Sequence, residues 1–244
     1  MDIFDEIYRG TPPRDIGRPQ KAFIELAGRG EIRGSVLDIG CGTGEHALFV
    51  AGAGHEALGI DTAPLAIQKA REKAAERGLP ARFLVGNVLN LSGLNGRFDI
   101  VIDSGLFHTL SDKDRPVLAE SLATVLAPGG RYFMLCFSDR NPGEYPLPRR
   151  IAMAEIRDTF QDGWSIDYVR PAVFENTVQA DGHLAWLASY RERRRNDVIG
   201  RDGTTQTLIE RGGGCSTDFL SSLPVRWNSS TPREAISSTS QSAR

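Results

Sequence analysis

The chain has 244 residues, a formal net charge of −2 and 40% hydrophobic residues. This length and composition predict one ordinary globular domain with room for an appendage. The near-neutral charge leaves no basic footprint for nucleic acid or acidic membranes, and no apolar run approaches the roughly 20 residues of a membrane span. We therefore expect neither a nucleic acid nor a membrane as partner.

The start of the chain and the cysteines predict the compartment. Residues 1–6 are acidic and lack the basic and apolar regions of a signal peptide. Cys41, Cys136 and Cys215 lie far apart and form no C-x-x-C pair. We expect free thiols in a reducing cytoplasm, no metal site, and a monomer or weak dimer.

In chain order, residues 1–17 come first, as a predicted lid segment. They mix prolines and a glycine with apolar groups, and Tyr8 and Ile16 favour packing on the domain. An ordinary flexible terminus is the alternative. Residues 18–29 predict a helix whose inward face carries Phe23, Ile24, Leu26 and Ala27.

Residues 35–50 predict a strand, a glycine turn and the start of a helix. The apolar run that ends at Ile39 suits a buried parallel strand, and Gly40, Gly42 and Gly44 follow it. Glycines let the backbone turn sharply and let a ligand lie against it, while the first N–H groups of the helix point at that ligand. A glycine turn without a ligand is the alternative.

Strands and helices then alternate. Further strands are predicted at residues 56–61, 81–85, 98–103 and 131–137, and helices at 63–77, 112–126 and 151–160. The first of these helices should be stopped by Gly78 and the second by Pro128-Gly129-Gly130, and the apolar stripe of the first is Ala66, Ile67, Ala70 and Ala74. Two later segments, 164–170 and 184–190, predict an antiparallel pair at the sheet edge. The order predicts an α/β fold with a doubly wound, mostly parallel, seven-stranded Rossmann-like sheet over residues 18–195. Residues 196–244 are rich in Ser, Thr and Gly without periodicity, which predicts a disordered tail.

The polar ends of the predicted strands indicate one ligand site, because open parallel sheets bind ligands outside the carboxyl ends of their strands. These ends hold residues 38–44, 61–62, 86–88 and 103–108. Asp61 can accept two hydrogen bonds from a ribose diol, or it can cap the next helix. Asn87 can contact the edge of an adenine, or it can simply form a turn.

Two residues bear on the kind of ligand. The third glycine of a dinucleotide fingerprint would fall at Glu45, whose charge would repel a pyrophosphate at the helix start. Asp38, two residues before the first glycine, suits a cationic ligand with an ammonium group. This D-x-G-x-G-x-G pattern resembles motif I of the class I S-adenosylmethionine-dependent methyltransferases.

The resemblance extends over residues 18–137 and implies S-adenosylmethionine as cofactor. It places the methionine part on Asp38 and the glycine loop, the ribose on Asp61, and the adenine at Asn87 and Val88. The cofactor-binding residues that we expect are Asp38, Gly40, Cys41, Gly42, Thr43, Gly44, Asp61, Thr62, Asn87, Val88 and Asp103.

Residues 103–108 and 12–20 bear on the acceptor. Residues 103–108 lack the paired prolines of many amino-group methyltransferases. Together, the two stretches look like bacterial small-molecule enzymes related to thiopurine, thiol and heterocyclic-toxin methyltransferases. In that group an N-terminal lid covers the cofactor, and an aromatic residue often follows the two prolines where this chain has Arg14. We expect Tyr8, Ile16 and Phe107 to lie at the lid and the acceptor.

His108 is the candidate general base, because an imidazole titrates near neutrality; a structural or helix-start histidine is the alternative. The predicted activity is methyl transfer from S-adenosylmethionine to O, N or S of a small aromatic or heterocyclic acceptor. A nicotinamide-dependent oxidoreductase and a non-catalytic S-adenosylmethionine-binding protein are the alternatives.

Overall fold

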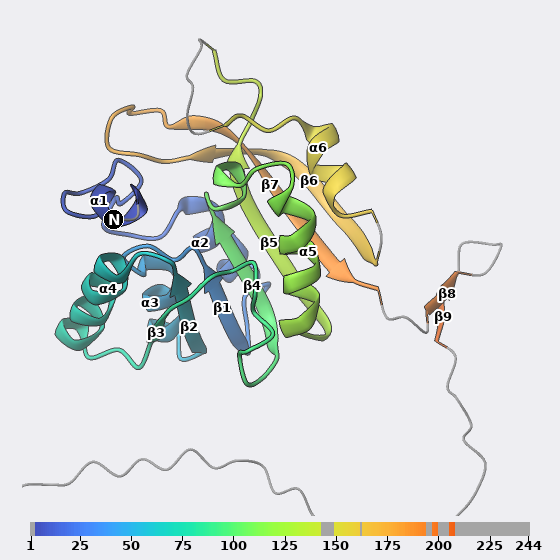
Figure 1. Ribbon diagram of the computed structural model, residues 1–244, viewed down its shortest axis with the longest axis horizontal. Helices are drawn as coiled ribbons and strands as arrows, with labels where there is room; N and C mark the ends of the chain where they lie inside the picture. Colours follow the sequence, from blue (N-terminus) through green and yellow to red (C-terminus); the bar gives the residue numbers. More distant parts are fainter. Residues whose placement is uncertain (1–2, 143–148, 162, 194–196, 200–204, 208–244) are drawn as a thin grey trace, which may run out of the picture. The chain divides into compact units, whose positions relative to one another are not determined.

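The computed structural model describes residues 3–142, 149–161, 163–193, 197–199 and 205–207. Seven strands form one sheet in the order β3-β2-β1-β4-β5-β7-β6 (Figure 1). Neighbours from β3 to β5 run parallel, whereas β7 runs antiparallel to both β5 and β6. The predicted fold is therefore confirmed. The strands are β1 (Ser35–Ile39), β2 (Glu56–Asp61), β3 (Arg82–Val85), β4 (Phe98–Ser104), β5 (Leu126–Phe137), β6 (Trp164–Phe174) and β7 (His183–Glu192).

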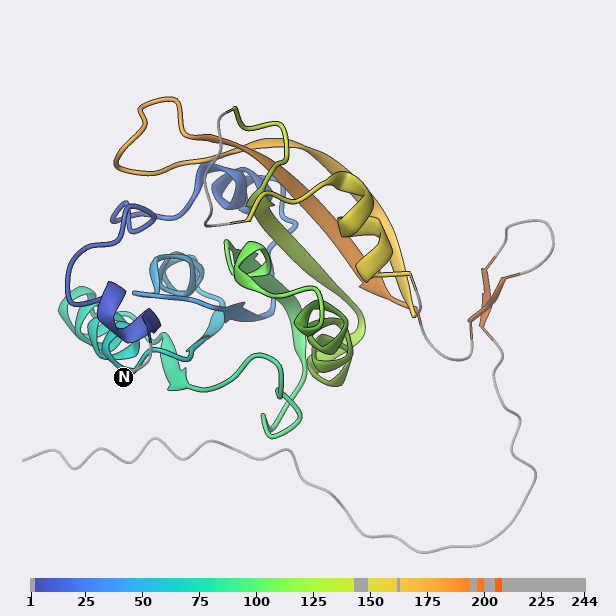
Figure 2. The ribbon, with the colours of Figure 1, turned by 45° about the horizontal axis from the view of Figure 1, so that its top comes forward.

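Helices cover both faces of this sheet. In Figures 1 and 2, α5 and α6 lie on one face, and the helices of the first part of the chain lie on the other. The helices are α1 (Ile3–Ile7), α2 (Lys21–Gly28), α3 (Glu45–Gly52), α4 (Pro64–Arg77), the 3-10 turn η1 (Phe107–Thr109), α5 (Asp114–Val125) and α6 (Met153–Thr159).

Alternation along the central strands makes two apolar layers, because successive side chains of a strand point to opposite faces. In β4, Val101 packs with Leu118 and Leu122 of α5, whereas Ile100 and Ile102 pack on the side of α2 and α3. Because helices cover both faces of the sheet, a ligand can reach it only at the ends of the strands. The ends of β1, β2 and β4 lie together at one rim, since these strands are parallel neighbours.

The predicted helix boundaries hold where local signals are strong. In α4 the buried residues are Ala66, Ile67, Ala70 and Ala74, as expected, and Gly78 ends the helix with a φ of 62°. The prediction that Ile24 of α2 faces inward is wrong, because this residue is 40% exposed. The buried stripe of α2 is Ala22, Phe23 and Leu26, and Ile24 lies one residue off it.

The helix α5 ends at Val125, before the predicted Pro128-Gly129-Gly130 stop. Strand β5 begins at once, and its register with β4 shifts between Phe98 and Ile100, which leaves residues 127–130 as an irregular segment. The glycines therefore serve the strand irregularity and not the helix end.

Two further strands pair antiparallel, β8 (Asp197–Ile199) with β9 (Thr205–Thr207), and the sequence did not predict them. The rest of the tail predicted as disordered, residues 196, 200–204 and 208–244, lies outside the described residues. Cys215 lies there too, while Cys41 and Cys136 are free and buried. Within the described part of the chain, no helix is long and apolar enough to cross a membrane.

Candidate active site

The turn between β1 and α3 is shaped by glycines at positions that exclude a side chain. Gly42 and Gly44 have φ angles of 53° and 84°, in the left-handed region that favours glycine. A Cβ atom on Gly42 would lie 2.6 Å from the Tyr8 hydroxyl, and one on Gly44 would lie 2.6 Å from the Phe83 ring. The turn is therefore a backbone surface with packed neighbours, as a cradle for a ligand requires.

Asp38 lies beneath this turn with its side chain buried. Its Oδ2 accepts a hydrogen bond from the Ala47 backbone N–H at 3.2 Å, while its Oδ1 has no partner among the described residues. Burial raises the pKa of this carboxyl well above its usual value. A buried acceptor without a donor is costly, so Oδ1 is suited to a cationic N–H group brought by a ligand.

Asp61, at the end of β2, binds two backbone donors. Its Oδ2 accepts from the Gly42 N–H and its Oδ1 from the Ala63 N–H, both at 2.9 Å. The second bond ties Asp61 to the start of α4, which was the alternative role for this residue. Each carboxylate oxygen keeps a second lone pair, so ribose binding stays a prediction that this geometry permits.

Two cavities open over the strand ends. The larger, about 250 Å³, is lined by Asp61, Thr62, Asn87 and Val88 together with Leu106 and Leu110. The smaller is lined by Cys41, Thr43, Ile16 and Gln20, among others. Four residues line both cavities and mark their junction: Tyr8, Arg14, Gly40 and Ser104.

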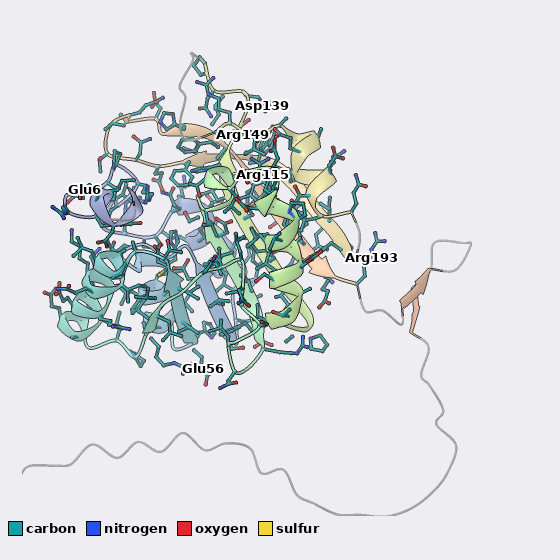
Figure 3. All side chains as sticks on the ribbon, in the orientation of Figure 1. Glu6, Glu56, Arg115, Asp139, Arg149 and Arg193 are labelled. Atoms are coloured by element: carbon teal, nitrogen blue, oxygen red, sulfur yellow. The ribbon has the colours of Figure 1, made fainter. Side chains whose placement is uncertain are left out.

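The lid segment packs on α4. Tyr8 is only 3% exposed, and its burial raises the pKa of the phenol to about 12. Lys69 donates to the backbone oxygens of Tyr8 and Gly10 at 2.7 and 3.0 Å, and Asp5 accepts from the Leu65 N–H at 2.9 Å. In Figure 3, Glu6 of α1 lies far from Glu56, the first residue of β2, which puts the lid at the opposite, carboxyl ends of the strands.

A polar chain joins the lid to the glycine turn. The Thr43 hydroxyl donates to Asp15 at 2.7 Å and accepts from Lys73 at 2.8 Å. Lys73 also binds Glu45 at 2.8 Å, and Arg77 binds the same carboxylate. Two cations thus offset the charge of Glu45. The repulsion that we expected between Glu45 and a pyrophosphate is therefore weaker than the sequence suggested.

The β6–β7 connection holds the lid from its other side. The Thr177 N–H donates to the Pro13 oxygen at 2.9 Å. Gln20 exchanges two hydrogen bonds with the Glu175 backbone, at 2.9 and 2.7 Å. The antiparallel end of the sheet therefore helps to position the N-terminal segment.

Asp103, like Asp38, does not line either cavity, but unlike Asp38 it has no oxygen without a donor, which argues against its predicted cofactor contact. It is fully buried and accepts hydrogen bonds from the Leu106 and Phe107 N–H groups at 2.8 and 3.1 Å and from the Tyr132 hydroxyl at 2.9 Å. Burial raises the pKa of this carboxyl to about 7. Asp103 therefore holds the turn after β4 and stabilises the fold.

Phe107 and His108 also turn inward, away from the predicted place at the acceptor. Phe107 is fully buried and stacks on Phe160 with ring centroids 6.0 Å apart. The Nδ1 of His108 accepts a hydrogen bond from the Phe137 N–H at 3.1 Å, so Nε2 carries the proton of the neutral ring. Burial lowers the pKa of His108 to about 3. This geometry does not fit a general base.

Comparison with known proteins decides the family. Residues 36–130 match the model of a methyltransferase domain. A 2-heptyl-1-hydroxyquinolin-4(1H)-one methyltransferase of Mycobacteroides abscessus is 38% identical over 204 residues, which are 79% of this chain and 90% of that protein. The chain belongs to the S-adenosylmethionine-dependent methyltransferases.

Solved structures agree with this family. A protein studied for the conversion of a disulfide bond into a thioacetal group during echinomycin biosynthesis is 36% identical to this methyltransferase, with a TM-score of 0.72 over 78% of this chain and 91% of that one. The magnesium protoporphyrin IX methyltransferase of Synechocystis, 22% identical with a TM-score of 0.53 over 71% and 76% of the two chains, shares the fold.

The described residues of the methyltransferase fit S-adenosylmethionine. The turn carries no side chain of its own at Gly40, Gly42 and Gly44, and Asp38 Oδ1 has no donor among the described residues. When bound, the cofactor supplies an electrophilic methyl group on a sulfonium. Individual contacts from Asp38, Asp61, Thr62, Asn87 and Val88 stay predictions. Asn87 Oδ1 already accepts from the Leu89 N–H at 2.9 Å, which is the turn role offered as its alternative.

Sequence reasoning missed Lys69 and Lys73, which hold the lid and the glycine turn. Within the predicted stretch 103–108 it singled out Asp103, Phe107 and His108, whereas Ser104 and Leu106 line the larger cavity. The spacing of the two lysines, one turn apart on α4, is the signal that they share a face.

Proposed function

We propose that this methyltransferase transfers the methyl group to O, N or S of a small aromatic or heterocyclic acceptor. The larger cavity carries the proposal, because Val88, Leu89, Leu106 and Leu110 form an apolar wall beyond the strand ends, beside polar residues such as Thr109 and Asp114. Such a wall suits a flat, largely apolar molecule. The Mycobacteroides abscessus relative, named for a heptyl-hydroxyquinolone, supports the same class of acceptor.

The two ends of the larger cavity suit different ligands, the cofactor at one end and the acceptor at the other. Asn87 and Val88 follow β3, where adenine is predicted, whereas Ser104 ends β4 and Leu106 and Leu110 follow it. We assign the β4 end to the acceptor. Methyl transfer needs alignment of the partners and exclusion of water, and a lid that packs Tyr8 over the junction serves both needs.

An acceptor panel tests the proposal. The purified full chain is incubated with S-adenosylmethionine and with hydroxyquinolones, phenols, aryl thiols or N-heterocycles, and with peptide and RNA controls. We expect formation of S-adenosylhomocysteine and addition of one methyl group, by mass spectrometry, for members of the aromatic set. Cofactor binding without transfer to any acceptor would instead favour the non-catalytic alternative, and transfer to peptide or RNA alone would contradict the acceptor class.

We further propose that the enzyme works in the cytoplasm as a monomer or weak dimer, without nucleic acid or membrane. The near-neutral net charge of −2 and the free thiols Cys41 and Cys136 support this setting. Light scattering over a range of protein concentrations measures the oligomeric state, and a stable higher oligomer would contradict it.

A further inference from the structure

Arg14 stands at the junction of the two cavities. It lines both, together with Tyr8, Gly40 and Ser104. Gly40 belongs to the turn predicted to hold the methionine part, and Ser104 ends the strand assigned to the acceptor. A charged group at this point therefore faces the place where the two reactants meet.

The guanidinium of Arg14 forms no ion pair with a carboxylate of the residues that the structure describes. Its hydrogen bond goes to the Tyr8 hydroxyl at 2.9 Å, with the guanidinium carbon 5.2 Å from the ring centroid. Several other arginines have acidic partners, whereas Arg71 and Arg97 bind backbone oxygens. Arg115 and Arg149, labelled near one another in Figure 3, share Asp112 and Glu155.

The acids that line the cavities with Arg14 bind other groups. Asp61 accepts two backbone N–H groups, and Asp114 accepts from the Ser111 hydroxyl at 2.7 Å. Asp15 binds Thr43, and Glu45 binds Lys73 and Arg77. Tyr8, with its pKa near 12, stays protonated at neutral pH. The positive charge of Arg14 is therefore open to a ligand.

The candidate imidazole does not supply a base at this site. His108 accepts a backbone N–H through Nδ1, so its Nε2 carries the proton and can only donate. His46, which lines the smaller cavity, accepts the Gln20 N–H through Nε2 at 3.2 Å, so its ring is also engaged with the backbone. A site with an open cation and no imidazole free to take a proton favours a nucleophile that arrives already ionised.

We propose that Arg14 is a specificity-determining residue that selects acceptors whose reacting oxygen or sulfur is ionised, such as a phenolate, an N-hydroxy anion or a thiolate. This inference rests on the proposed function. In the transfer, the anionic oxygen or sulfur donates an electron pair to the methyl carbon, and the carbon–sulfonium bond breaks with its pair onto sulfur. Anion and sulfonium both become neutral, and no proton has to leave.

The test uses the full chain and three substitutions. Arg14→Gln removes the charge, Arg14→Lys keeps it, and Arg29→Gln removes a charge that lies outside the lid and the cavities and pairs with Glu31. The acceptors are a series of substituted phenols and thiophenols of graded acidity, with an aromatic amine as the neutral nucleophile. The measurements are kcat/KM against pH for each acceptor and the cofactor Kd by calorimetry.

We expect Arg14→Gln to lower kcat/KM for ionised acceptors by about tenfold or more, as loss of a charge-assisted hydrogen bond does. The kcat/KM for the amine and the cofactor Kd should change by no more than about twofold, Arg14→Lys should keep part of the rate, and Arg29→Gln should match the unsubstituted chain. Equal losses for ionised and neutral acceptors, or a loss confined to cofactor affinity, would overturn the role of Arg14. Failure of the unsubstituted chain to methylate any acceptor would overturn the proposed function, and this inference with it.

Discussion

At the scale of single residues, Asp61 is the sharpest test of the cofactor site. We expect Asp61→Ala to weaken cofactor binding by roughly 1.5–3 kcal/mol, because charge-assisted bonds to the ribose would be lost. The same change frees the Gly42 and Ala63 N–H groups, so the melting temperature should also fall. Asp61→Asn keeps one acceptor and should lose less. If calorimetry showed unchanged cofactor affinity in folded Asp61→Ala, the assignment of Asp61 to the ribose would be wrong.

His108 gives a prediction in pH. Its pKa of about 3 in the folded chain lies below the ordinary value of 6.5, so the unfolded chain binds more protons between these values. The stability from its neutral form is present above about pH 6.5 and is lost as the pH falls from there toward 3. His108→Asn should therefore flatten the acid limb of a plot of melting temperature against pH.

Asp103 changes the stability with pH in the opposite direction, and its pH range overlaps that of His108. Its pKa is raised to about 7, so the stability that its protonated form contributes is lost as the pH rises through that value. The contribution of His108 is therefore read from the difference in melting temperature between His108→Asn and the unsubstituted chain at each pH. His55→Asn, at a histidine that is only half-buried, serves as control. An acid limb equally steep in His108→Asn would show that this ring does not carry the effect.

At the scale of elements, we predict that turnover depends on the lid. Deletion of residues 1–16 should cut kcat far more than it lowers the melting temperature, because the lid excludes water from the junction and contributes only a small satellite cluster around Tyr8 to the core. Lys69→Met removes two of its tethers and should change kcat in the same direction to a smaller extent. Normal turnover after deletion would show that closure of the lid is not required.

At the scale of the whole molecule, the sheet is complete at Glu192 of β7. Truncation after Arg195 should leave the melting temperature and cofactor affinity nearly unchanged, since residues 196–244 are too polar to build a core. Truncation after Leu187 cuts β7 in two and should abolish folding. A large loss of stability or affinity on removing residues 196–244 would show that they pack on the domain.

The sequence by itself determined the elements and the ligand turn. Local periodicity predicted α4 down to its buried stripe, because a helix presents every third and fourth residue to one side. The apolar run and the glycines of residues 35–44 predicted β1 and its turn, because only glycine tolerates left-handed backbone against close neighbours. Strand order then placed the site at the carboxyl ends.

Only the tertiary structure decided where the side chains at those ends point. Asp103 turns inward to Tyr132, and His108 to the Phe137 N–H, both from β5 and each 29 residues away. Thr43 meets Lys73 from α4, 30 residues away. Arg14 faces the junction because α4 and the β6–β7 connection hold its segment there. Such directions depend on partners distant in the chain, which neither spacing nor composition encodes.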